Sequence, residues 1–101
     1  AAVHHLTKKL AADLAPRGIT VNAIAPGYVL TRMSKGLVSW TKDGSLDEFT
    51  KSIPLGRMGN EDDMGGACLY FASRAGAWCT GVILNVDGGT VGTMQIPLSN
   101  L

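Results

Sequence analysis

Apolar residues recur every three or four positions along the first fifteen residues of the chain, with alanines between them. The repeat consists of Val3, Leu6, Leu10 and Leu14. This spacing predicts an amphipathic helix over residues 1–15. We expect it to end at Pro16 and Gly18, because proline does not continue a helix and glycine suits the left-handed turn after one. No helix-capping residue precedes Ala1, so we expect the helix to begin upstream, in a longer protein.

Two short apolar runs predict strands. Residues 19–25 are apolar on both faces and stop abruptly at Pro26-Gly27, which is typical of a covered parallel strand. Residues 82–86 predict a second strand, continuous and buried, and Asp87-Gly88-Gly89 forms the turn after it. We expect Asp87 to serve as a turn aspartate.

A helix is predicted between these strands, over residues 61–73. Asn60 is a suitable N-cap, and the three acidic residues after it lie near the positive end of the helix dipole. Gly65 and Gly66 weaken the helix, so we expect close backbone packing there. One face carries apolar residues that we expect to be buried: Met64, Ala67, Cys68 and Phe71.

The order strand, helix, strand predicts an α/β fold with two parallel strands and a right-handed crossover. Two short strands are too few for an independent parallel sheet, so this unit should be incomplete on its own. The connection at 28–59 has little periodicity apart from a capping box at Ser45 and Glu48, and connections of this length are often lids or binding segments. The tail at 90–101 is too mixed to assign.

Composition excludes several classes of function. Nine Lys and Arg residues against eight Asp and Glu give a net charge of +1, which offers no basic surface for nucleic acid or an anionic membrane. No apolar run reaches the roughly 18 residues of a membrane span. Cys68 and Cys79 match neither a disulfide framework nor a metal-binding pair, so we expect a reducing, cytoplasmic location. His4 and His5 would point about 100° apart on a helix, so they would not hold one metal ion together.

Three segments resemble the short-chain dehydrogenase/reductase family. Residues 19–31 resemble its sixth strand and the loop that follows, residues 53–62 resemble the segment before its last long helix, and residues 80–89 resemble its final strand. They occur in the family's order, and the resemblance covers about residues 1–92. Arg32-Met33 and the loop at 75–78 most resemble reductases of the 3-oxoacyl-carrier-protein type.

The resemblance implies that residues 1–101 are the C-terminal part of one Rossmann-type domain, which has a doubly wound parallel sheet. Residues 28–59 would form the substrate lid and residues 90–101 a tail. Members carry a glycine-rich phosphate loop and a Tyr-x-x-x-Lys pair, and neither occurs in this sequence. We therefore assign no catalytic residue to this chain and expect it to be inactive alone.

Two tyrosines precede an arginine by four positions but do not fit the catalytic role. That role needs a tyrosine whose pKa is lowered by a nearby lysine, so that it can exchange a proton with the substrate oxygen. Tyr70 should lie on a helix far from the ligand edge of the sheet. Tyr28 follows Pro26-Gly27, where we expect a substrate contact rather than a proton donor.

By resemblance, Pro26, Gly27 and Val29 line the nicotinamide of NADP or NAD. Val29 would offer backbone groups to the carboxamide, and Thr31 would contact the carboxamide or the phosphates. Taken alone, Pro26-Gly27 is more simply the end of a strand. Combined with the other motifs, the cofactor contact is favoured.

Apolar residues in the connection would supply contact area for an acyl chain or another apolar ketone. The predicted lid residues are Tyr28, Met33, Leu37 and Trp40, with Leu46 and Phe49 in support. For any one of them, packing of a short amphipathic helix over the core is an equally good interpretation.

The leading prediction is therefore part of an NAD(P)-dependent oxidoreductase that transfers a hydride between nicotinamide and a carbonyl or alcohol substrate. Family members usually form dimers or tetramers, which implies a homo-oligomer here. The alternative is a non-catalytic oligomerisation or binding module derived from such an enzyme.

Overall fold

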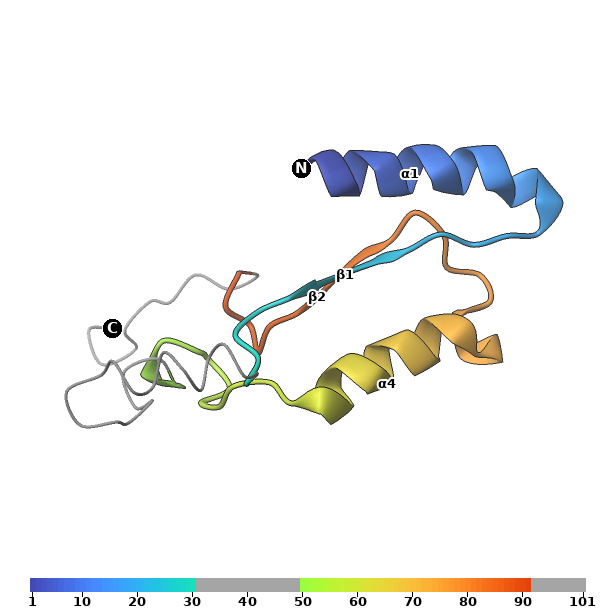
Figure 1. Ribbon diagram of the computed structural model, residues 1–101. Helices are drawn as coiled ribbons and strands as arrows, with labels where there is room; N and C mark the ends of the chain where they lie inside the picture. The colour runs from blue at the N-terminus through green and yellow to red at the C-terminus, as the bar shows by residue number, and fades with distance from the viewer. Residues whose placement is uncertain (31–49, 92–101) are drawn as a thin grey trace, which may run out of the picture.

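The structure, a computed structural model, describes residues 1–30 and 50–91. Its elements, in order, are helix α1 (Ala2–Leu14), a 3₁₀ turn η1 (Ala15–Arg17), strand β1 (Ala23–Pro26), helix α4 (Glu61–Ala72), a 3₁₀ turn η2 (Arg74–Gly76) and strand β2 (Ile83–Val86). The two strands lie side by side, with α1 over one face and α4 over the other (Figure 1). The α/β architecture predicted from the sequence is confirmed.

Strands β1 and β2 are parallel, and their register runs from Ala23 opposite Ile83 to Pro26 opposite Val86. Backbone pairing continues past the strand end, because the Gly27 amide donates to the Val86 carbonyl over 3.1 Å. The parallel pairing predicted for the β-α-β unit is therefore confirmed.

Both strands begin later than the sequence pattern predicts, and the side chain of Asn22 explains why. Its amide oxygen accepts a hydrogen bond from the Val82 amide at 3.0 Å, and its amide nitrogen donates to the Cys79 carbonyl at 3.0 Å. The Asn22 side chain thus occupies backbone groups before β2, and the Val82 amide is one that a longer β1–β2 pairing would use. The predicted strands began at residues 19 and 82 because that prediction used only the apolar character of the sequence.

Helix α1 ends as predicted, with Gly18 in the left-handed conformation at φ 74°. Its buried face is not the predicted apolar stripe. Thr7 and Ala11 are buried, whereas Val3 is 67% exposed and Leu6 is 55% exposed. Ala11 faces Gly81: a Cβ built on Gly81 would lie 3.6 Å from the Ala11 Cβ, which is ordinary van der Waals contact.

Helix α4 begins at the predicted cap. The Asn60 side chain accepts from the Asp63 amide at 3.1 Å, and the Asp63 carboxylate accepts from the Asn60 amide at 2.8 Å, which together form a capping box. Two other expectations are wrong. Cys68 is exposed, and apart from the adjoining residues and backbone of α4 itself, no described atom lies within 4 Å of a Cβ built on Gly65 or Gly66.

The narrow sheet accounts for this exposure of α4. Two strands spaced about 4.8 Å apart present a surface no wider than a helix, whose diameter with side chains is about 10 Å. Met64, Ala67 and Phe71 are half-buried, and among the described hydrophobic residues only Ala11 and Ile53 are buried. So small a core agrees with the expectation that two strands need further sheet.

Candidate functional site

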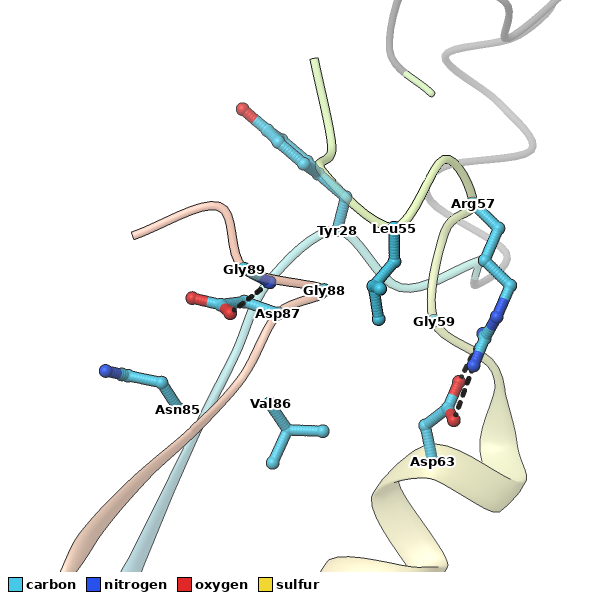
Figure 2. A pocket seen from close by; sticks show the side chains of 10 residues that line it. All are labelled: Tyr28, Leu55, Arg57, Gly59, Asp63, Asn85, Val86, Asp87, Gly88 and Gly89. Carbon is cyan, nitrogen blue, oxygen red and sulfur yellow. Dashed lines mark hydrogen bonds and ion pairs between the residues drawn. The ribbon is translucent and has the colours of Figure 1, made fainter. Parts of the chain in front are cut away.

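A pocket of about 430 Å³ lies at the carboxyl ends of β1 and β2, beside the N-terminus of α4. Figure 2 shows residues from both strand ends and from the segment before α4 around it. Its lining residues are Tyr28, Leu55, Arg57, Gly59, Asp63, Asn85, Val86, Asp87, Gly88 and Gly89. In open α/β sheets, this edge is where ligands bind.

The floor of the pocket depends on the close approach of the two strand ends. A Cβ on Gly27 would lie 2.6 Å from the Asp87 Cβ and 2.8 Å from its Cα. These distances are shorter than any tolerated contact, so Gly27 packs directly on the Asp87 backbone. Its lack of a side chain is thus explained by the fold itself.

Asp87 is a turn aspartate, as predicted. One carboxylate oxygen accepts from the Gly89 amide at 2.9 Å, and the other accepts from the Val91 amide at 3.1 Å. Gly88 has a φ of 63°, and the Ile53 side chain occupies the space that a side chain at Gly88 would need: an added Cβ would lie 2.7 Å from the Ile53 Cγ2. The Leu55 amide donates to the Gly88 carbonyl at 3.1 Å, so this turn receives the chain that returns from the 28–59 connection.

The opposite wall is a single parallel β-bridge between Val29 and Gly59. The Gly59 amide donates to the Tyr28 carbonyl at 2.9 Å, and the Leu30 amide donates to the Gly59 carbonyl at 3.1 Å. In a parallel ladder this pattern directs the amide and carbonyl of Val29 itself away from Gly59.

Three charged residues line the pocket, Arg57, Asp63 and Asp87, and the first two form an ion pair. The guanidinium contacts both carboxylate oxygens, with Nη1–Oδ2 at 2.8 Å and Nη2–Oδ1 at 3.1 Å. These hydrogen bonds, with one from the Asn60 amide, lower the pKa of Asp63 to about 2. Asp63 therefore stays ionised at neutral pH, and the same pair raises the pKa of Arg57.

The predicted site residues divide into three groups. Tyr28, which is 48% exposed, lines the pocket. Its neighbours Pro26, the last residue of β1, Gly27 and Val29 do not line the pocket. The remaining predicted contacts lie outside the described residues, namely Thr31, Met33, Leu37, Trp40, Leu46 and Phe49, as do the capping box at 45–48 and most of the tail.

Tyr70 lies toward the other end of α4 from the pocket. Its hydroxyl is 3.7 Å from the Cys79 Sγ, and this contact raises the pKa of Tyr70. A tyrosine that exchanges a proton with substrate near neutral pH needs the opposite shift. Neither the position nor the pKa of Tyr70 favours a catalytic role.

Comparison with known proteins identifies the family. A family model described as enoyl-(acyl carrier protein) reductase matches residues 1–91. The chain belongs to the short-chain dehydrogenase/reductase family. The relationship expected from its three sequence segments is thus confirmed.

Relatives in this family carry different names. The chain is 47% identical over 88 residues to a 2-dehydro-3-deoxy-D-gluconate 5-dehydrogenase from Bacillus subtilis, covering 87% of this chain and 34% of that protein. It is 40% identical over 83 residues to a 3-oxoacyl-(acyl-carrier-protein) reductase from Chlamydia muridarum, covering 82% and 32%. The chain therefore spans about a third of the length of these relatives.

The fold also matches a solved family member. A crystal structure described as a 2-deoxy-D-gluconate 3-dehydrogenase from Agrobacterium tumefaciens, with bound NADP, superposes with a TM-score of 0.79 at 41% identity. The match covers 90% of this chain and 36% of that one. The small parallel sheet is therefore part of a short-chain dehydrogenase/reductase fold.

Sequence reasoning missed several residues that line the pocket of this family member. Arg57 and Asp87 both stand in segments that carried the family resemblance, yet neither was assigned to the site. Asn85 was assigned only to a strand. The carboxyl ends of parallel strands meet at one edge, so strand order was a usable signal for Asn85 and Asp87. The Arg57–Asp63 pairing had no such signal, because it depends on how the loop closes.

Among the described residues, no helix is long and apolar enough to cross a membrane.

Proposed function

We propose that this chain supplies one wall of the nicotinamide site and the substrate lid of an NAD(P)-dependent oxidoreductase. The reaction is hydride transfer between nicotinamide and a carbonyl or alcohol carbon. One observation carries the proposal: a pocket opens at the carboxyl ends of two parallel strands, between Tyr28 and the Asp87 turn. Because the chain spans a third of its relatives, the activity is that of the whole protein.

The cofactor contacts we propose are Pro26, Gly27, Val29 and Thr31. The geometry of the β-bridge supports a backbone role for Val29, because its own peptide groups are directed away from Gly59. The nicotinamide, when bound, gives or accepts the hydride. The cofactor is NADP or NAD, and the NADP in the related crystal structure favours this class of ligand.

The substrate contacts we propose are Tyr28, Met33, Leu37 and Trp40, within a lid at 28–59. Their apolar side chains favour a substrate of the 3-oxoacyl type, and one relative bears that name. The acid and base groups of the reaction would come from the Tyr-x-x-x-Lys pair of the family, which is not in this sequence. The intact enzyme is proposed to act as a dimer or tetramer.

A chimera tests this proposal directly. The chain replaces the matching segment of the NADP-binding Agrobacterium tumefaciens protein, and NADPH affinity is measured by fluorescence titration. We expect the chimera to bind NADPH and Thr31→Ala to weaken binding by about tenfold or more, which corresponds to one lost hydrogen bond. The control is Thr20→Ala, an exposed threonine before β1, which should leave the affinity unchanged.

A chimera that folds, judged by circular dichroism, but binds no NADPH would overturn the proposal. The isolated 101-residue chain should show no cofactor-dependent carbonyl reduction, since it has neither the Tyr-x-x-x-Lys pair nor the phosphate loop. Turnover by this chain alone would refute the assignment of acid–base chemistry to residues outside it.

The second candidate is a non-catalytic oligomerisation or binding module. The observation in its favour is the exposed apolar face of α1, formed by Val3, Leu6 and Leu10. Mass spectrometry of the native protein, captured with an antibody against residues 53–64, separates the two candidates. A species of 10.6 kDa would favour the module, and one more than twice that mass would favour the oxidoreductase.

A further inference from the structure

Two described limbs belong to the 28–59 connection: residues 28–30, which leave β1, and residues 50–59, which return to α4. The returning limb contacts the chain just after both strands. On the β1 side, Gly59 exchanges two backbone hydrogen bonds with Tyr28 and Leu30. On the β2 side, Ile53 is 3% exposed and packs on Gly88. The peptide that follows Pro26-Gly27 is therefore oriented by contacts with the returning limb.

Arg57 and Asp63 close a ring around Gly59. The bidentate ion pair spans six residues, and Arg57 Nη1 also donates to the Met58 carbonyl at 3.0 Å. Asp63 Oδ2 meanwhile accepts from the Asn60 amide at 2.8 Å. Gly59 is thus held by side-chain contacts on both sides of it in sequence, and Figure 2 shows the two side chains facing each other beside it.

The Arg57 contact exceeds what the helix cap requires. The capping box needs only Asn60 and Asp63, and Asp63 would keep that role without a partner. Arg57 has a side chain that is 56% exposed, and a simple exposed ion pair adds little stability. A two-pronged fork, however, fixes direction as well as distance. The space at Gly59 is also limited, since an added Cβ would lie 3.5 Å from the Val29 Cγ2 and 3.6 Å from Asp63 Oδ2.

We propose that Arg57 and Asp63 are positioning residues, whose ion pair holds Gly59 against residues 28–30 and so fixes the direction of the Val29 peptide beside the pocket. The pair acts through Gly59 and does not itself touch the reacting atoms. The inference rests on the proposed function only in its last step, in which the Val29 peptide serves the nicotinamide.

Hydrogen exchange measured by mass spectrometry on the whole native protein tests the first step. We expect Arg57→Gln and Asp63→Asn each to speed exchange at the Gly59 and Leu30 amides by about tenfold or more, because both amides donate in the bridge. Asp63→Asn retains a side-chain oxygen that can accept the hydrogen bond from the Asn60 amide, so the N-terminus of α4 should persist. Arg57→Lys should restore part of the protection, since lysine keeps the charge without the fork.

The matched control is Asp13→Asn, which breaks the exposed Lys9–Asp13 ion pair of 3.2 Å on α1 and should leave exchange at Gly59 unchanged. The Ala23 and Gly27 amides of the β1–β2 ladder should also keep their rates. Unchanged exchange at Gly59 in Arg57→Gln would overturn the proposal. So would uniform acceleration that includes the ladder, because the pair would then act on global stability alone.

NADPH affinity tests the second step. In the whole native protein, Arg57→Gln should weaken NADPH binding by about tenfold while the amides of the β1–β2 ladder keep their exchange rates. A looser Gly59 with unchanged affinity would overturn the link to the cofactor. Absence of binding by the unmodified protein would instead refute the proposed function, and the exchange measurement would still decide whether the pair holds Gly59.

Discussion

Gly27 shows how a single position can be required by packing rather than by a ligand. Its α-carbon lies against the backbone of Asp87, and an added Cβ would come within 2.8 Å of the Asp87 Cα. Backbone atoms on a hydrogen-bonded turn have little room to shift. The identity of this residue is therefore explained before any cofactor is considered, and the same contact sets the distance between the two strand ends.

Replacing Gly27 by alanine should lower the free energy of unfolding by about 1–3 kcal/mol, the usual cost of overpacking. Gly65 provides the control, since no described atom beyond the adjoining residues and backbone of α4 lies within 4 Å of an added Cβ, and alanine is favoured over glycine in a helix by about 1 kcal/mol. Gly65→Ala should therefore stabilise the protein. Urea denaturation of both variants measures the two effects, and equal stabilities would show that the Asp87 turn moves aside.

Asp63 gives the protein a specific sensitivity to acid. Its pKa in the fold is about 2, against an ordinary value of 3.8, chiefly because Arg57 and the Asn60 amide bond to the ionised form. A lowered pKa means that the ionised group stabilises the fold above about pH 4. This contribution is then lost as the pH falls from about 4 through about 2.

The urea midpoints of the unmodified protein and of Asp63→Asn should therefore differ by a constant amount near neutral pH. The difference should shrink between about pH 4 and pH 2, where the carboxylate becomes protonated in the folded state. A difference that stays constant down to pH 2 would contradict the role of the ionised carboxylate. Asp13→Asn provides a control on an exposed carboxylate of α1.

At the scale of elements, Asn22 joins the start of β1 to the loop before β2. Its side chain donates to the Cys79 carbonyl and accepts from the Val82 amide, both at 3.0 Å. Lys8 of α1 adds a bond to the Gly81 carbonyl at 3.1 Å, so helix and both strands meet there. At the amino ends of the strands these side-chain bonds add to backbone bonds from Gly81 to Val21 and from Ala23 to Val82.

Asn22→Ala should cost about 1–3 kcal/mol, because two partly buried backbone groups lose their partner. Thr80→Val is the control: it removes one exposed hydrogen bond to the Val21 amide and should cost little. Stability is measured by thermal unfolding, and local opening by exchange at the Val82 amide. Equal losses in the two variants would argue against a special role for Asn22.

At the scale of the whole molecule, much apolar surface lies outside the small core. On α1 the exposed apolar face comprises Val3, Leu6 and Leu10, and on α4 Leu69 is exposed. Between β1 and α4, a shallow hollow of about 390 Å³ is lined by Thr20, Asn22, Ile24, Cys68, Phe71 and Ala72. Apolar faces of this extent usually contact other protein surface.

If the α1 face joins two copies of the protein, Leu6→Glu should reduce the mass measured by analytical ultracentrifugation, because a charge at the contact loses its hydration without a partner. Ala12→Glu is the control, since Ala12 is exposed on the opposite side of the helix. An unchanged mass in Leu6→Glu would place the α1 face outside any contact between copies.

The sequence by itself determined the order of the elements, the N-cap of α4 and the turn at Gly18. These features depend on local preferences: a period of three to four residues, an N-cap at Asn60, and a glycine free to adopt positive φ. The order of three motifs also indicated the family. Such signals are carried by residues close together in the chain, so they survive without knowledge of the fold.

Only the tertiary structure decided where the strands begin, which face of α1 is buried, and what lines the pocket. Each depends on residues far apart in sequence. Asn22 meets Val82, Ala11 lies near Gly81, and Gly27 packs on Asp87. Hydrophobic periodicity states which side chains gain from burial, but the neighbours that bury them are set by the width of the sheet. For that reason the sequence predicted the helices α1 and α4 but not which of their side chains are buried.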